Sequence, residues 1–318
     1  MRAAPFPRGL SALAKILLAA TFLLVIAGGL VTSTGSGLSV PDWPTTYGQN
    51  MFTFPPSKWV GGIRFEHSHR LIAASVGMLT VAFAARAWGA RAPKSVRVLS
   101  AIAVAAVVAQ GVLGGLTVRF LLPTPISVAH ACLAQAFFAL TLVLAVVTSR
   151  AWRDSGRPLS FAPAERAGLA AGLLAFSAVF VQLVLGAWMR HGDAGLAIPD
   201  FPTSFGRLVP DRWNPKIAIH FAHRAWAAVV ALAIFSSAFA VRRARRDEAP
   251  RRVSLALSLL LPVQMFLGAL SIWSGKAVAF TVAHQTTGAL ILAGTVALAL
   301  SLARGETAAV PVRAAVSA

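Results

Sequence analysis

Long apolar runs alternate with short polar or basic stretches along the whole chain. Spanning the hydrocarbon core of a bilayer takes roughly 20 predominantly apolar residues in a helix. Eight runs reach this length, near residues 12–32, 67–88, 98–118, 126–148, 167–189, 218–240, 253–273 and 279–302. The pattern therefore predicts an all-α membrane protein with eight transmembrane helices. We expect the first run to be a retained helix, because it is longer than the apolar core of a signal peptide.

Composition and charge support this interpretation and orient the helices. The chain has 318 residues, of which 57% are hydrophobic and only 12% charged, and its net charge is +19. Nineteen of the 29 lysines and arginines lie in the termini and in the loops after the second, fourth and sixth runs. Basic loops stay in the cytoplasm, so both termini are predicted to be cytoplasmic. The same rule explains the positive charge, and we expect no nucleic-acid partner.

The two halves of the sequence repeat each other. The matching segments are "GSGLSVPDWPTTYG" (35–48) with "DAGLAIPDFPTSFG" (193–206), "EHSHR" (66–70) with "HFAHR" (220–224), and "VAHACLAQAF" (128–137) with "VAHQTTGALI" (282–291). The offset is 158 residues in the first pair and 154 in the others. A four-helix unit has therefore been duplicated, and its even helix number gives both copies the same orientation. This predicts two tandem, pseudo-symmetric four-helix bundles, residues 1–157 and 158–318.

Four histidines stand at matching places in the two halves. His69 and His130 lie in the predicted first turns of the second and fourth helices, and His223 and His284 repeat them in the sixth and eighth. These helices all run inward, so each pair lies at one depth. Two imidazoles at equal height can ligate a haem iron from both sides within a helix bundle. A proton relay or a zinc site are alternatives, although zinc usually takes at least three protein ligands.

The residues beside these histidines differ between the halves. Arg70 and Arg224 follow their histidines and are candidates for binding haem propionates, or else for reaching the membrane interface. Glu66 precedes His69 by three residues and therefore shares its helix face, whereas the matching residue is His220. Glu66 is either an ion-pair partner of Arg70 or a carboxylate directed at the cofactor. The second possibility predicts a division of labour, with chemistry in the first half and a permanent haem in the second.

The remaining candidates receive simpler interpretations. His67 is expected to face away from His69, His191 to lie in a loop, and Cys132, the single cysteine, to be a small core residue. Glycines recur in "QGVLGGL", "QLVLGA" and "QMFLGAL". They allow close helix packing and can also make room for a haem ring.

These motifs together resemble the haem A synthase family of bacterial and mitochondrial inner membranes. The resemblance runs from "GSGLSVPDWP" through "EHSHR", "VAH" and "HFAHR" to "VAHQTTGALI". It implies a multi-pass protein of the bacterial inner membrane that oxidises the C8 methyl group of haem O to a formyl group. The product, haem A, serves cytochrome oxidase.

The resemblance also implies roles for the candidate residues. Haem b is the implied cofactor, with iron ligands His223 and His284. Substrate haem would be held by His69 and His130, and the family's catalytic glutamate matches Glu66, as a base or as a stabiliser of developing positive charge. The implied partners are haem O, haem O synthase, the cytochrome oxidase assembly system and an electron partner, and a homo-oligomer is possible.

Two other functions use the same features. A dihaem b-type electron-transfer protein or quinol oxidoreductase would need the four histidines but not Glu66. A transporter would explain the repeat, although the apolar runs lack the interruptions and midplane charges typical of transporters. Pigment analysis of the purified protein distinguishes the three, because each predicts a different haem content.

Overall fold

The computed structural model describes residues 6–154, 163–244 and 248–303. Its long helices are α1 (Leu10–Ser33), α2 (Ile63–Gly89), α3 (Lys94–Arg119), α4 (Thr124–Val147), α6 (Pro163–His191), α7 (Pro215–Ala244), α8 (Glu248–Trp273) and α9 (Val278–Leu302). A short helix, α5 (Arg150–Asp154), and a 3₁₀ turn, η1 (Pro56–Lys58), complete the helical elements. Within the described residues, eight helices are long and apolar enough to cross a membrane. The predicted all-α class and the eight apolar helices are thus confirmed.

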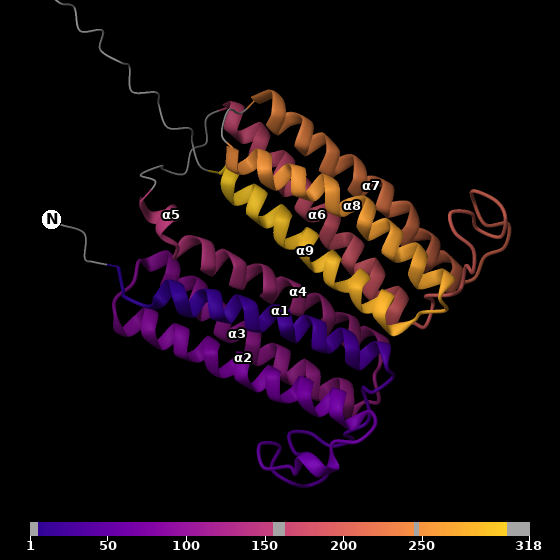
Figure 1. Cartoon of the computed structure of the whole chain (residues 1–318), viewed down its shortest axis with the longest axis horizontal. Helices are drawn as coiled ribbons and strands as arrows, with labels where there is room; N and C mark the ends of the chain where they lie inside the picture. The colour runs from indigo at the N-terminus through magenta and orange to yellow at the C-terminus, as the bar shows by residue number, and fades with distance from the viewer. Residues whose placement is uncertain (1–5, 155–162, 245–247, 304–318) are drawn as a thin grey trace, which may run out of the picture.

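The long helices are arranged in two groups of four (Figure 1). In the first group α1 packs on α2 and α4, and α3 packs on α2 and α4. In the second group α6 packs on α7 and α9, and α8 packs on α7 and α9. The groups meet where α1 and α4 contact α9 and where α4 contacts α6. Val25, Phe138 and Ala289 form a small apolar cluster across this contact.

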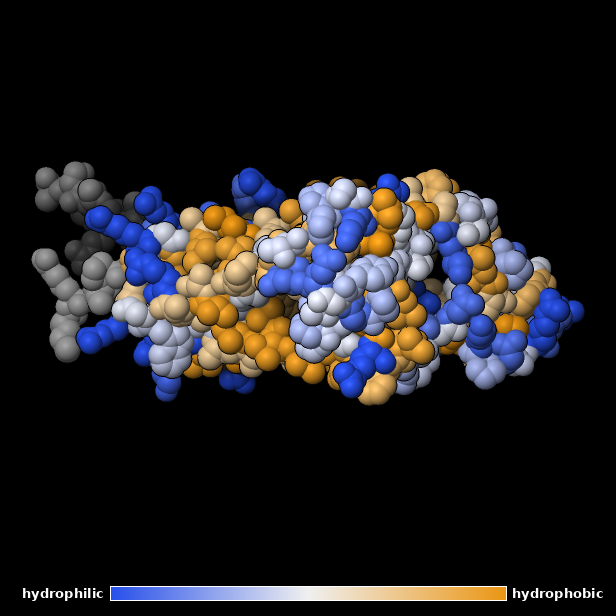
Figure 2. Space-filling model, turned by 90° about the horizontal axis from the view of Figure 1, so that it is seen from below, coloured by the Kyte–Doolittle hydropathy of each residue, from blue (hydrophilic) through white to orange (hydrophobic). Residues whose placement is uncertain are grey.

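The surface matches a membrane environment. In Figure 2 apolar residues cover much of this face, with hydrophilic residues at the left and right ends and a further hydrophilic patch at the centre. The long loops 34–62 and 192–214 emerge at the same end of the helices, opposite the start of α1 at Leu10 (Figure 1). This placement follows from the even number of helices in each group. Which end faces the cytoplasm stays a prediction from the basic loops.

Several helices begin earlier than the apolar pattern predicts. α2 starts at Ile63 rather than at 67, because the polar residues Arg64 and Glu66 belong to its first turn. α4 similarly starts at Thr124, and α9 at Val278. The predicted first-turn position of the histidines is therefore wrong: each of the four lies in the second or third turn of its helix. Two turns span about 11 Å. The histidines therefore lie roughly that far along their helices from the helix start, which is deeper than a first-turn position would be.

Candidate functional site

Each of the four predicted ligand histidines packs against a glycine of the preceding long helix. The pairs are His69 with Gly28, His130 with Gly114, His223 with Gly186 and His284 with Gly268. A Cβ atom added at any of these glycines would lie 2.9–3.2 Å from the Cε1 atom of the ring. Glycine therefore lets the ring lie this close to the neighbouring backbone, whereas a Cβ would make the ring shift. The glycines noted in the sequence make room for the ligands themselves, in addition to bringing the helices together.

The second half brings two imidazoles to a separation that suits one metal ion. The ring centroids of His223 and His284 lie 6.4 Å apart, with an interplanar angle of 70°. Imidazole nitrogens bind metals at about 2 Å, which places the centres of two rings on one metal roughly 6 Å apart. Both side chains are partly buried. The spacing and the neutral donor set fit axial ligation of a haem iron.

The backbone also orients His284 for ligation. Its Nδ1 atom lies 3.0 Å from the carbonyl oxygen of Gln264. In the tautomer in which Nδ1–H donates to this carbonyl, Nε2 carries the lone pair. Metal-bound histidines commonly donate their second nitrogen to a backbone carbonyl in this way. In the first half, Nδ1 of both His69 and His130 is buried without a hydrogen-bond partner.

Two glutamines that the sequence analysis overlooked contact the ligands of the second half. Gln182 Nε2 donates to the carbonyl oxygen of His223 at 2.9 Å, and Gln264 Nε2 approaches Nε2 of His284 at 3.5 Å. Each glutamine lies four residues before the glycine under the same imidazole, and Gln110 has this position beside His130. The signal was present as Q-x-x-x-G in the three quoted glycine motifs.

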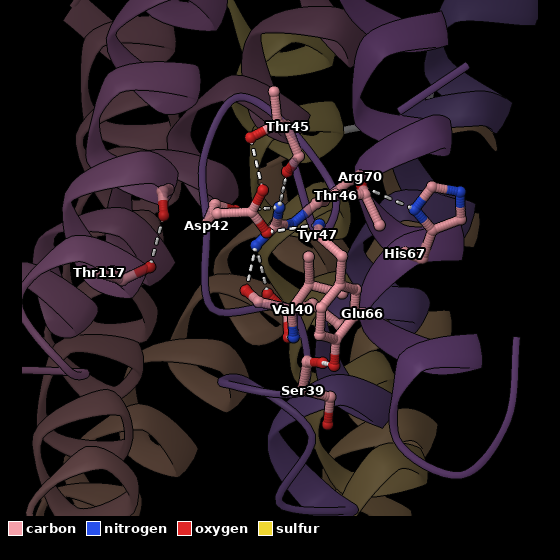
Figure 3. A network of polar contacts seen from close by, with 11 residues as sticks. Ser39, Val40, Asp42, Thr45, Thr46, Tyr47, Glu66, His67, Arg70 and Thr117 are labelled. Carbon is pink, nitrogen blue, oxygen red and sulfur yellow. Dashed lines mark hydrogen bonds and ion pairs between the residues drawn. The ribbon is translucent and has the colours of Figure 1, made fainter. Parts of the chain in front are cut away.

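Glu66 and Arg70 tie the first outer loop to α2 (Figure 3). An Nη2–H of Arg70 donates to Glu66 Oε1 at 2.6 Å, while Glu66 Oε2 accepts the N–H of Val40 at 2.8 Å. Arg70 also donates to the carbonyl oxygens of Val40 at 2.8 Å, Asp42 at 2.6 Å and Thr45 at 3.1 Å. Glu66 is only 3% exposed. The ion pair considered from the sequence is therefore present, and the guanidinium is directed at the loop.

The second half keeps the loop contacts without the acid. The Nδ1 atom of His220 accepts the N–H of Ile198 at 3.2 Å. Arg224 donates to the carbonyl oxygens of Ile198 at 2.9 Å and Thr203 at 3.0 Å. Ile198 is the repeat partner of Val40, so His220 replaces Glu66 as the acceptor of the same backbone N–H. What distinguishes the first half is therefore the negative charge at this position.

An aspartate shapes each outer loop. Asp42 accepts the N–H groups of Tyr47 and Gly48, both at 2.8 Å (Figure 3). Asp200 accepts those of Phe205 at 2.7 Å and Gly206 at 2.9 Å, together with the hydroxyl of Thr203. The N–H of Gly206, with the Thr203 hydroxyl and the Phe205 N–H, holds the pKa of Asp200 well below its ordinary value. The two loops thus share one turn architecture.

The other histidines lie outside the ligand pairs. The ring of His67, on α2, contacts Phe54 and Trp59 of the first outer loop, and its Nδ1 is 3.2 Å from the hydroxyl oxygen of Thr46. The expectation that it faces away from His69 agrees with this placement. His191 was expected in a loop, which is wrong: it is the last residue of α6. The predicted apolar run ends before Arg190, whereas the helix continues through Arg190 to His191.

A polar group between the two halves was also missed by the sequence analysis. Arg190 of α6 donates to Gln285 Oε1 at 2.5 Å, to the carbonyl oxygen of Gly29 at 3.0 Å and to Ser33 Oγ at 2.6 Å. Gln285 in turn donates to the carbonyl oxygen of Val25 at 3.1 Å. Gln285 directly follows His284, so this group links one ligand helix of the second half to α1 of the first. The repeat partners are Thr32 and Ala131, which cannot form such a pair.

Comparison with known proteins matches the sequence of this chain to one family. A family model described as COX15-CtaA, cytochrome oxidase assembly protein, matches residues 11–60 and 63–296. A curated protein of Shouchella clausii named Heme A synthase is 33% identical over 229 residues, 71% of this chain and 73% of the relative. A protein of the same name from Sphingopyxis alaskensis is 31% identical over 344 aligned positions, 92% of each chain.

Proposed function

The chain belongs to the COX15-CtaA family of cytochrome oxidase assembly proteins, and on this premise we propose that it is a haem A synthase. It oxidises the C8 methyl group of haem O to a formyl group and so provides haem A for cytochrome oxidase. The conversion is a four-electron oxidation of the methyl carbon that adds one oxygen atom, so an oxygen source and an electron partner are further requirements. Haem O synthase, as the source of the substrate, is an expected neighbour in the membrane, and a homo-oligomer is compatible with the proposal.

The observation that carries the proposal is the set of four imidazole–glycine contacts, two in each half. His223 and His284 would hold haem b as the resident cofactor, at the separation already described. When bound, haem b supplies one-electron redox chemistry to the protein. The helices contribute ligation and fixed orientation. The Gln264 carbonyl orients the His284 ring, while Gln182 Nε2 donates to the backbone carbonyl of His223 and lies 3.3 Å from its Nδ1.

The first half would bind haem O through His69 and His130. Glu66 lies one turn before His69 on α2, and residues three positions apart are neighbours on a helix surface. We assign Glu66 the catalytic role, as a base or as a stabiliser of positive charge developing at the methyl carbon. Its contacts with Arg70 and the Val40 N–H hold the carboxylate in a fixed position. His220 at the equivalent place has no negative charge to offer, which supports chemistry in the first half alone.

Arg70 and Arg224 are proposed to bind the propionates of the two haems. In the second half one donor is available for this purpose, because Nε of Arg224 is buried without a hydrogen-bond partner. Arg70 already donates to three loop carbonyls and to Glu66, so a propionate would share its guanidinium with the loop. Propionate binding would then couple the position of the loop to occupancy of the haem site.

The two halves, residues 1–157 and 158–318, are proposed to work as a substrate bundle and a cofactor bundle in the bacterial inner membrane. Both termini would face the cytoplasm, and the loops shaped by Asp42 and Asp200 would lie outside. The histidine pairs then lie in the outer part of the membrane. This depth suits an amphiphilic substrate whose carboxylates remain near the outer surface.

Pigment analysis of the purified protein tests the proposed function. The protein is produced in cells that also make haem O, and its haems are extracted and separated by chromatography. Haem b together with haem O or haem A supports the synthase. Haem b alone points to a dihaem electron-transfer protein or quinol oxidoreductase, and a protein without haem overturns both assignments.

A further inference from the structure

We propose that haem O enters the first half from the side, through a groove between α1 and α2. The groove has a volume of about 320 Å³ and is lined by Ala27, Leu30, Arg64, Phe65, Ser68 and Ile72. During entry the propionates lie at Arg64, before Arg70 binds them in the site, and the isoprenoid chain runs along Leu30 and Ile72. The inference rests on the proposed function and adds a route and a binding surface for its substrate.

The groove lies beside the ligand pair of the first half. Ala27 directly precedes Gly28, and Ser68 directly precedes His69, whose ring packs on that glycine. A molecule that fills the groove therefore lies beside the helix segments that carry this contact, although His69 itself does not line the groove. The volume is at the lower end of the roughly 300–1,000 Å³ typical of ligand pockets. It suits part of a haem, with the remainder inside the bundle or in the lipid.

The chemistry of the lining matches an amphiphile of this kind. Arg64 is exposed at the outer end of the groove, where its guanidinium can pair with a carboxylate. Ile72 lies eight residues further along α2, about 12 Å deeper in the membrane. The lining between them is apolar apart from Ser68. Haem O has two propionates on one edge of its ring and an isoprenoid chain on the opposite edge, so one orientation satisfies both ends.

The second half is built differently at the same positions. The repeat replaces Ala27 with Leu185, Leu30 with Trp188 and Ile72 with Trp226, and it replaces the polar residues Arg64 and Ser68 with Ala218 and Ala222. The indole N–H of Trp226 donates to the carbonyl oxygen of Ala178 at 2.9 Å, so this side chain bridges α7 and α6. Three lining residues, Ala27, Leu30 and Ile72, are thus larger in the second half. Phe65 is replaced with the smaller Ile219, and the cation is gone.

This difference fits the two proposed haems. A substrate must enter and leave at every turnover, whereas a resident cofactor needs to stay. Haem b also lacks the isoprenoid chain, so its site has no need of an apolar channel to the lipid. We infer that the groove between α1 and α2 admits the substrate, and that the larger side chains between α6 and α7 retain the cofactor.

The main test introduces the large side chains of the second half into the groove. Leu30→Trp and Ile72→Trp are combined, and the protein is purified from cells that lack haem O. Haem O is then added in detergent, and its uptake is followed by absorbance and by extraction after washing. Uptake should fall by about tenfold or more, because several chain atoms lose apolar contacts. Met78→Trp is the matched control, since Met78 lies on the same helix, is 60% exposed and does not line the groove.

Haem b content separates a blocked groove from a misfolded protein. Both variants should retain resident haem b as the wild type does. The reverse exchange gives an independent measurement: Trp188→Leu combined with Trp226→Ile should speed transfer of haem b to an added haem acceptor such as apomyoglobin.

Unchanged haem O uptake by the double tryptophan variant, with haem b retained, would overturn the groove and leave the proposed function intact. If the double tryptophan variant loses haem b, the reverse exchange decides. An unchanged rate of haem b transfer to apomyoglobin would then overturn the proposed groove. Absence of haem O uptake by the wild-type protein would overturn the proposed function itself, and the groove with it.

Discussion

The carboxylate of Glu66 and the guanidinium of Arg70 lie 2.6 Å apart, and together they fasten the first outer loop to α2. Both side chains are largely buried, so this pair is shielded from the solvent screening that weakens surface ion pairs. In the second half His220 makes the corresponding loop contact without a charge. A structural and a catalytic function of Glu66 can therefore be separated by substitutions that keep the loop contact.

We predict that Glu66→Gln and Glu66→His both lose haem A production while they keep haem b. The amide keeps the size of the side chain, and histidine reproduces the residue of the second half. Conversion should slow by roughly the 10²–10⁴-fold typical of a lost acid–base group. Haem O should accumulate in cells that express either variant, as measured by extraction. Normal haem A output from Glu66→His at equal protein levels would leave Glu66 with loop attachment alone.

We predict that His223→Ala or His284→Ala removes most of the haem b from the purified protein. Each substitution takes away one of two axial ligands, and the remaining imidazole has no partner at 6.4 Å. The matched control is His67→Phe, because the repeat places Phe221 at that position and both rings contact a loop tryptophan. A full low-spin haem spectrum in either alanine variant would show that the ligands are assigned incorrectly.

Gly114→Val should impair binding of haem O and leave haem b in place. A Cβ at this position would lie 3.2 Å from Cε1 of His130, and the two further methyl groups would displace the ring. Gly111→Val is the control on the same helix, since a Cβ there meets nothing within 4 Å. Haem O titration of the two purified variants compares them directly. Equal affinity would mean that His130 does not depend on this close approach.

The topology predicts opposite results for reporter fusions in different loops. A fusion at residue 160, which lies outside the described residues, should report the cytoplasm. Fusions at residues 50 and 205, in the two long loops, should report the external side. The three readings are compared within one strain at equal expression. An external signal at residue 160 would reverse the arrangement.

Acid should loosen the second outer loop. The pKa of Asp200 is lowered because the Gly206 N–H and its other donors favour the carboxylate. The stabilisation is therefore fully present above the ordinary aspartate value of about 3.9 and is lost as the pH falls through the lowered pKa. Asp200→Asn should show the loosened loop already at neutral pH, as faster cleavage by an added protease. Equal cleavage of variant and wild type at pH 7 would contradict this role.

Much of the framework could be predicted from the sequence because it depends on local properties. The length of an apolar run determines whether a helix can span the bilayer, so eight helices followed from hydropathy alone. The duplication made His69, His130, His223 and His284 stand out from the other histidines. It also exposed the exchange of Glu66 for His220, because a repeat supplies its own reference sequence.

The tertiary structure decided which groups meet. Arg70 is bound to carbonyls of a loop some 25–30 residues away, and Arg190 contacts residues of α1 and α9 from α6. Neither set of partners is encoded in nearby sequence, since each depends on how distant segments pack. Helices start earlier than the apolar pattern predicts for a related reason. Polar residues such as Glu66 can belong to a helix when a folded loop provides their hydrogen-bond partners. The sequence by itself determined the helices and the ligand candidates, and packing alone placed each imidazole on its glycine and left a groove open beside His69.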